Sequence, residues 1–223
     1  AFRRFVLEPA AQIASDMVHP VIGWTIRQLF EHLQTARGYI ALTGLPATGK
    51  SELARAVAAR TSSRYIADAV GHLGSVTSCG PSKGASIERE QAWLRRRAEL
   101  ISKDRWPDGT QVGISDFWLG QHLAYGRVWF DQADCAELEA TWHAWQDRVV
   151  PPKLLVLLEK PLDPSAGRPT QRGNPHPSRR LDLLSDGLRA LFLRKGYGPI
   201  LELDAARPDW ALTELTAAVE AMA

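Results

Sequence analysis

Residues 44–51 constrain this chain more than any other part of its sequence. They read GLPATGKS and match the phosphate-loop pattern Gly-x4-Gly-Lys-Ser. The glycines of this pattern let the backbone wrap so that its N–H groups point at phosphate oxygens, and the helix that follows adds its positive end. The residues expected to bind ATP are Gly44, Leu45, Pro46, Ala47, Thr48, Gly49, Lys50 and Ser51. In this motif Lys50 reaches the β- and γ-phosphates, and the Ser51 hydroxyl binds Mg²⁺.

The flanking segments suit the motif, because an apolar run at 39–43 predicts a buried strand and 49–60 predicts a helix. Further strands are predicted at 64–67, 111–115, 153–158 and 200–203. Helices are predicted at about 20–36, 85–103, 118–130, 134–148, 181–195 and 208–222, and residues 1–19 are expected to be irregular. This alternation predicts an α/β chain with a three-layer P-loop NTPase fold, in which a five-stranded parallel sheet carries helices on both faces. We expect 1–38 to be a lead-in with an amphipathic helix, and 39–223 to be a P-loop kinase domain.

Composition removes several classes of function. The 223 residues carry a net charge of only +2, which argues against a general nucleic-acid binder. No apolar run approaches the roughly 20 residues of a membrane span, so no membrane partner is expected. Cys79 and Cys135 have neither metal-site spacing nor a disulfide pattern, and a cytoplasmic location is expected. Whether the chain forms a homodimer stays open.

The type of P-loop protein is the harder question. Guanine-specific GTPases carry an Asn-Lys-x-Asp stretch, but here the one asparagine, Asn174, is followed by Pro175. A short five-stranded chain with an arginine-containing loop at 159–180 favours a small-molecule kinase. Arg168 and Arg172 in that loop are candidates for a lid that clamps the transferring phosphoryl group. The alternative is a solvated basic loop.

Two carboxylates follow predicted strands and are expected at the edge where parallel strands end and ligands bind. Asp116 follows the strand at 111–115 and is a candidate second contact to Mg²⁺, beside Ser51, or else the N-cap of the next helix. Asp68 follows the strand at 64–67 and is a candidate general base for a substrate hydroxyl, or else a turn carboxylate.

The helix predicted at 85–103 carries two further candidates. Gln91 shares its apolar stripe, so its amide is either satisfied locally or contacts a ligand such as a nucleobase. Arg95, Arg96 and Arg97 point in three directions, so at most one of them faces a site.

The chain resembles the deoxynucleoside kinases, and more closely their bacterial deoxyadenosine-kinase-like relatives, over about residues 39–222. Besides the phosphate loop, the matching segments are YIADAV at 65–70, QAWL at 91–94, SDFW at 115–118, PKLLVLL at 152–158 and 203–222. The resemblance implies that Asp68 is the acidic base, that Gln91 contacts the nucleobase, and that 159–180 is the lid. It also places Asp116 at the start of the family's Asp/Glu-Arg-Ser motif.

Several residues depart from that family pattern. Phe117 stands where the motif has Arg, and Trp118 stands where it has Ser. Asp68 is shorter than the usual Glu. Another arginine, such as Arg127, could supply the missing guanidinium. The sequence therefore defines the site for the phosphoryl donor, ATP, better than the site for the phosphoryl acceptor.

The function expected from the sequence is ATP- and Mg²⁺-dependent phosphoryl transfer to a small-molecule hydroxyl, most favourably that of a deoxynucleoside or nucleoside. One alternative is another small-molecule kinase, including a nucleoside-monophosphate kinase. A second alternative is a nucleotide-binding regulatory protein with little transfer activity.

Overall fold

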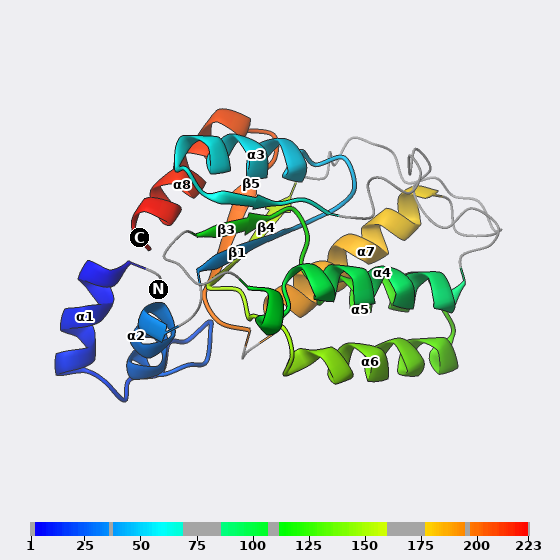
Figure 1. The fold of residues 1–223 in the computed structure, drawn as a ribbon, viewed down its shortest axis with the longest axis horizontal. Helices are drawn as coiled ribbons and strands as arrows, with labels where there is room; N and C mark the ends of the chain where they lie inside the picture. Colours follow the sequence, from blue (N-terminus) through cyan, green and yellow to red (C-terminus); the bar gives the residue numbers. More distant parts are fainter. Residues whose placement is uncertain are drawn as a thin grey trace.

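The computed structural model describes residues 3–35, 38–68, 86–106, 112–159, 177–194 and 197–222. Five strands form one sheet in the order β2-β3-β1-β4-β5, and each neighbouring pair is parallel (Figure 1). The strands are β1 (Tyr39–Thr43), β2 (Arg64–Ile66), β3 (Gly113–Ser115), β4 (Leu154–Glu159) and β5 (Ile200–Asp204). The five-stranded parallel sheet predicted from the sequence is confirmed.

Helices cover both faces of the sheet, as predicted, and form two separate apolar cores. The helices are α1 (Arg4–Ile13), α2 (Ile26–Thr35), α3 (Lys50–Arg60), α4 (Ile87–Leu100), α5 (Gln121–Trp129), α6 (Gln132–Gln146), α7 (Pro177–Phe192) and α8 (Pro208–Glu220). The first core joins α1, α2, α3 and α8 to one face, and the second joins α4 to α7 to the other. Side chains of β1 alternate between them, since Ile40 lies in the first core and Ala41 in the second. This arrangement is the predicted three-layer architecture.

The N-terminal helix α1 was not predicted, because residues 1–19 were expected to be irregular. Charges and Pro9 break its apolar pattern, and Pro9 lies inside the helix. Its one buried side chain, Leu7, joins the core that also contains Leu29 of α2. Burial of Leu7 against α2 therefore stabilises this short helix.

Helix α2 begins at Ile26, not at the predicted Pro20. Thr25 and Gln28 form a reciprocal capping box, in which each side chain accepts a hydrogen bond from the other's backbone N–H at 3.1 and 2.8 Å. Gly23, with φ of 79°, adopts a left-handed conformation that ends any helical run from Pro20. Residues 20–25 are therefore a turn, and Ile22 is buried without being helical.

Other boundaries move by a few residues. Helix α7 begins at Pro177, inside the segment 159–180 that was predicted to be a loop. In the described parts of the chain, no helix has the length and apolarity needed to cross a membrane.

The strand register brings the candidate residues to one edge of the sheet. Ile66 of β2 pairs with Ser115 of β3, and Ser115 also pairs with Ala41 of β1. Residues that follow these three strands therefore emerge side by side. They include the phosphate loop after β1, Asp68 after β2 and Asp116 after β3.

Candidate functional site

The phosphate loop joins β1 to α3 and depends on two glycines. Gly44 has a φ of 146°, and a Cβ there would lie 2.2 Å from the carbonyl oxygen of Leu158, so no larger residue fits. Gly49 has a φ of 86°, precedes the first residue of α3, and has open space around its Cα. The loop therefore leads directly into the positive end of a helix, as anion binding requires.

Lys50 lies against the loop that it belongs to. Its Nζ donates hydrogen bonds to the carbonyl oxygens of Gly44 and Leu45 at 3.0 and 2.6 Å. Burial lowers the pKa of Lys50 to about 8, although the nearby Asp116 carboxylate acts in the opposite direction. An anion bound in the loop would add a further favourable charge interaction with this ammonium.

ATP binding is expected to weaken as the pH rises above 7.5. Lys50 loses its proton as the pH passes about 8, so affinity should fall about tenfold between pH 7.5 and pH 9. Calorimetric titration with a non-hydrolysable ATP analogue and Mg²⁺ measures this change. The Lys50→Arg variant is the control, because its guanidinium stays charged and its affinity should not vary over this range. A wild-type affinity that is independent of pH would contradict the assignment of Lys50.

Asp116 connects the phosphate loop to the end of β2. Its Oδ2 accepts hydrogen bonds from the Ser51 hydroxyl at 2.5 Å and the Tyr65 hydroxyl at 2.7 Å. Its Oδ1 accepts one from the backbone N–H of Asp68 at 2.7 Å. Burial and the Asp116 carboxylate raise the pKa of Tyr65 to about 12, so the phenol remains a donor. Since the N-cap of α5 is Gly120, the alternative interpretation of Asp116 as a helix cap is wrong.

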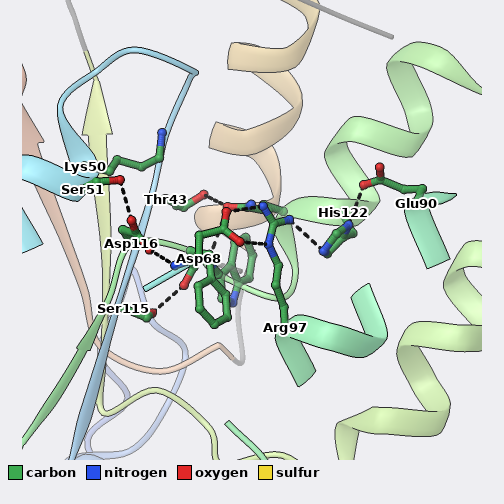
Figure 2. Close-up of polar contacts among 12 residues, drawn as sticks. Thr43, Lys50, Ser51, Asp68, Glu90, Arg97, Ser115, Asp116 and His122 are labelled. Atoms are coloured by element: carbon green, nitrogen blue, oxygen red, sulfur yellow. Dashed lines mark hydrogen bonds and ion pairs between the residues drawn. The ribbon is translucent and has the colours of Figure 1, made fainter. Parts of the chain in front are cut away.

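Asp68 is held by a buried arginine that the sequence did not single out. Arg97 of α4 donates from Nε to Oδ1 at 2.9 Å and from Nη2 to Oδ2 at 2.6 Å, which makes a two-pronged ion pair (Figure 2). Arg95 and Arg96 are exposed, so one of the three arginines turns inward, as expected. Asp68 is thus an ion-paired carboxylate just after β2, and its role as a general base stays a prediction.

A histidine and a glutamate extend this contact. Arg97 Nη1 lies 2.9 Å from Nε2 of His122, and His122 Nδ1 lies 2.5 Å from Oε1 of Glu90 (Figure 2). Burial, assisted by the charge of Arg97, lowers the pKa of His122. The imidazole is therefore neutral at pH 7.

Arg97 lies close to Phe117, the residue that stands in place of the arginine of the Asp/Glu-Arg-Ser motif. Phe117 is fully buried, and the guanidinium carbon of Arg97 lies 5.8 Å from the centre of its ring. A guanidinium thus reaches this site from α4 rather than from the residue after Asp116. The sequence had suggested Arg127 as a substitute, and the structure brings Arg97 to Asp68 instead. Helical spacing could have indicated that Arg97 faces inward, because it lies three residues after the buried Leu94 and four before the buried Ile101.

Gln91 is buried, and both ends of its amide have protein partners. Its Nε2 donates to Glu137 of α6 at 2.9 Å, and its Oε1 accepts from Arg95 at 3.3 Å. The sequence left two alternatives for this amide. Its contacts favour the first, in which neighbouring side chains satisfy its hydrogen bonds, over contact with a nucleobase. Arg168 and Arg172 lie outside the described residues.

A cavity of about 260 Å³ lies beside the phosphate loop. Its walls include Thr48 and Gly49 of the loop, Leu53 of α3, and Pro208 and Leu212 of α8. The cavity adjoins the first turn of α3, the part of the helix that a phosphate bound in the loop would contact. Its position beside the loop makes it a candidate place for the remainder of a nucleotide whose phosphates occupy the loop, although Glu52 and Asp209 also line it.

Two solved structures of NadR protein share this architecture. A complex of NadR with NR matches with a TM-score of 0.54 over 85% of this chain and 54% of the NadR chain. A complex of NadR with NAD and AMP-PNP matches with a TM-score of 0.55 over 86% of this chain and 52% of the NadR chain. This is a P-loop NTPase fold. Sequence identity is 12% in both comparisons, so the similarity establishes the fold alone.

This P-loop chain spans about half the length of the two NadR chains that it matches. No protein-family model matches its sequence, and no curated protein matches it. The comparisons thus support the predicted P-loop fold, while membership of the deoxynucleoside kinase family is not confirmed.

Proposed function

We propose that this protein transfers the γ-phosphoryl group of ATP to a hydroxyl of a small molecule, most favourably a deoxynucleoside or nucleoside. The observation that carries the proposal is the position of the Asp116 carboxylate. It contacts Ser51 of the phosphate loop on one side and the backbone of Asp68 on the other. It therefore links the loop suited to ATP with a second carboxylate suited to receive a proton. NadR structures that contain NR, NAD and AMP-PNP support a nucleotide-related activity for this fold.

The reaction assigns one role to each side of the site. The acceptor oxygen forms a bond to the γ-phosphorus, and the bond from that phosphorus to the bridging oxygen breaks. ADP leaves with the electron pair of the broken bond, and the hydroxyl proton moves to Asp68. Lys50 and the loop N–H groups stabilise the charge on the phosphates. The cavity between α3 and α8 would hold the base of ATP.

The residues near Ser51 fit a magnesium ion. Mg²⁺ prefers oxygen ligands and is usually bound by one or two protein groups, with phosphate oxygens and water completing its shell. Ser51 Oγ and Asp116 Oδ2 are two such oxygens, 2.5 Å apart, beside the loop. These residues would hold the ion, which when bound neutralises charge on the phosphates.

The charges near Asp68 support an uncharged hydroxyl acceptor over one that carries a phosphate. Arg97 is the arginine that reaches this carboxylate in the described part of the site, and it is already paired with Asp68. Asp116 and Glu90 add negative charge nearby. A nucleoside monophosphate would need unpaired cationic groups for its phosphate. A nucleoside is the first candidate acceptor in this proposal, and a nucleoside monophosphate is the second.

An acceptor screen tests this proposal. The protein is incubated with ATP, Mg²⁺ and one compound at a time from a panel of nucleosides, nucleoside monophosphates and other small alcohols. ADP release that depends on a nucleoside, with the phosphorylated product seen by mass spectrometry, is the expected result. Release with monophosphates alone would favour the second candidate. ATP binding without release for any acceptor would favour a regulatory protein.

A further inference from the structure

Three of the N–H groups of Arg97 donate to side chains of the protein itself. A guanidinium has five such donors and no acceptor. Two donate to Asp68 and one to His122, as described above. The other two point toward the Gln121 amide, whose oxygen would accept them at 3.0 and 3.2 Å if the amide were turned over. In its present orientation this oxygen accepts from the Trp118 N–H and the Thr43 hydroxyl instead. Because its Nε and Nη2 both donate to the carboxylate of Asp68, Arg97 acts on the site chiefly through that residue.

Only one assignment of donors and acceptors fits the two hydrogen bonds of the His122 ring. Since a guanidinium only donates, Nε2 of His122 must be the acceptor and carries no proton. Nδ1 then carries the proton and donates it to Glu90. His122 is fully buried, and the charged groups around it are Arg97, Glu90 and Asp68. The imidazole is therefore fixed as the Nδ1–H tautomer.

Three elements of the fold meet in this chain of contacts. Glu90 and Arg97 lie two turns apart on α4, His122 lies on α5, and Asp68 follows β2. Glu90 fixes the imidazole, the imidazole orients the guanidinium, and the guanidinium fixes both oxygens of Asp68 (Figure 2). A carboxylate fixed in this way presents one orientation to a reacting hydroxyl, which lowers the entropic cost of reaching the transition state.

We propose that Arg97 is the positioning residue for Asp68, and that neutral His122, anchored by Glu90, holds Arg97 in place. This inference rests on the proposed function, in which Asp68 accepts the proton of the acceptor. It assigns Arg97, His122 and Glu90 to turnover and not to ATP binding.

A pair of substitutions at His122 tests the inference. His122→Leu removes the acceptor of Arg97 Nη1, and His122→Gln replaces it with an amide oxygen. We expect kcat to fall about thirtyfold in the leucine variant and less than threefold in the glutamine variant, with the KM for ATP within twofold of wild type in both. Melting temperatures show whether each variant is folded.

Arg97→Lys provides a second comparison, because a lysine keeps the charge but cannot hold both carboxylate oxygens. We expect kcat to fall about a hundredfold with the KM for ATP unchanged. A purely structural role would make the glutamine and leucine variants alike, or would change both kinetic constants together. Either result, or wild-type kcat in the leucine and lysine variants, would overturn the inference.

The tautomer of His122 can be measured whether or not an acceptor is found. In protein labelled with ¹⁵N, the imidazole shifts and couplings at pH 7 should show a protonated Nδ1 and an unprotonated Nε2. An imidazolium, or the Nε2–H tautomer, would overturn the inference, because Arg97 could not then donate to Nε2. A failed acceptor screen together with the Nδ1–H tautomer would count against the proposed function and leave the arrangement around Arg97 intact.

Discussion

Replacing Lys50 by alanine is expected to lower the affinity for ATP about a hundredfold, or by roughly 2.7 kcal/mol. The Lys50 ammonium lies within the phosphate loop, bonded to the carbonyl oxygens of Gly44 and Leu45. Removing it leaves the loop N–H groups and the end of α3 as the remaining attraction for three charged phosphates. Calorimetric titration with AMP-PNP and Mg²⁺ measures the loss.

Substitution of a second lysine, Lys103, controls for the loss of one positive charge and for any general loss of folding. Lys103 is exposed and donates to the backbone oxygen of Asp147, on another part of the surface. Lys103→Ala removes one positive charge, so its ATP affinity should stay within twofold of wild type. An ATP affinity that is equal in the Lys50→Ala variant and the wild type would refute the central assignment of this site.

The second large effect is expected at Asp68. Asp68→Asn should lower kcat by about 10²- to 10⁴-fold and leave ATP affinity nearly unchanged, because an amide cannot take the hydroxyl proton. Rapid-quench measurement of product formation at saturating ATP reports the chemical step. The substitution also removes the charge partner of buried Arg97, so a lower melting temperature is expected.

A longer carboxylate separates loss of chemistry from loss of the ion pair. Asp68→Glu keeps the negative charge beside Arg97 and adds one methylene, so its melting temperature should lie closer to that of the wild type. It should also turn over faster than Asp68→Asn, since a carboxylate can still accept the proton. Equal loss of turnover and of ATP affinity in Asp68→Asn would remove this residue as the base.

The features that the sequence predicted well are local ones. The phosphate loop is a continuous motif, and the apolar run of β4 reflects burial on both faces of a parallel sheet. Asp68 and Asp116 could be placed together because both directly follow strands that end at one edge. Each of these inferences needs only short stretches of chain and the rule that parallel strands share an edge.

The features that the sequence missed depend on distant partners. Helix α1 is stabilised by burial of Leu7 in a core shared with α2. Helix α2 begins later than the prediction of about residue 20 because the Thr25–Gln28 capping box fixes its first turn. The Arg97–Asp68 pair joins residues 29 positions apart, and helical spacing alone could have shown only that Arg97 faces inward.

The route by which Arg97 reaches Asp68 also bears on how such proteins are recognised. In the motif that this chain resembles, the arginine directly follows the acidic residue, whereas here Phe117 occupies that position and α4 supplies the guanidinium. The ion pair that holds Asp68 therefore joins residues 29 positions apart and leaves no continuous signature in the sequence. Proteins with the same arrangement would be found by comparing the positions of charged groups in space, and not by comparing continuous runs of residues.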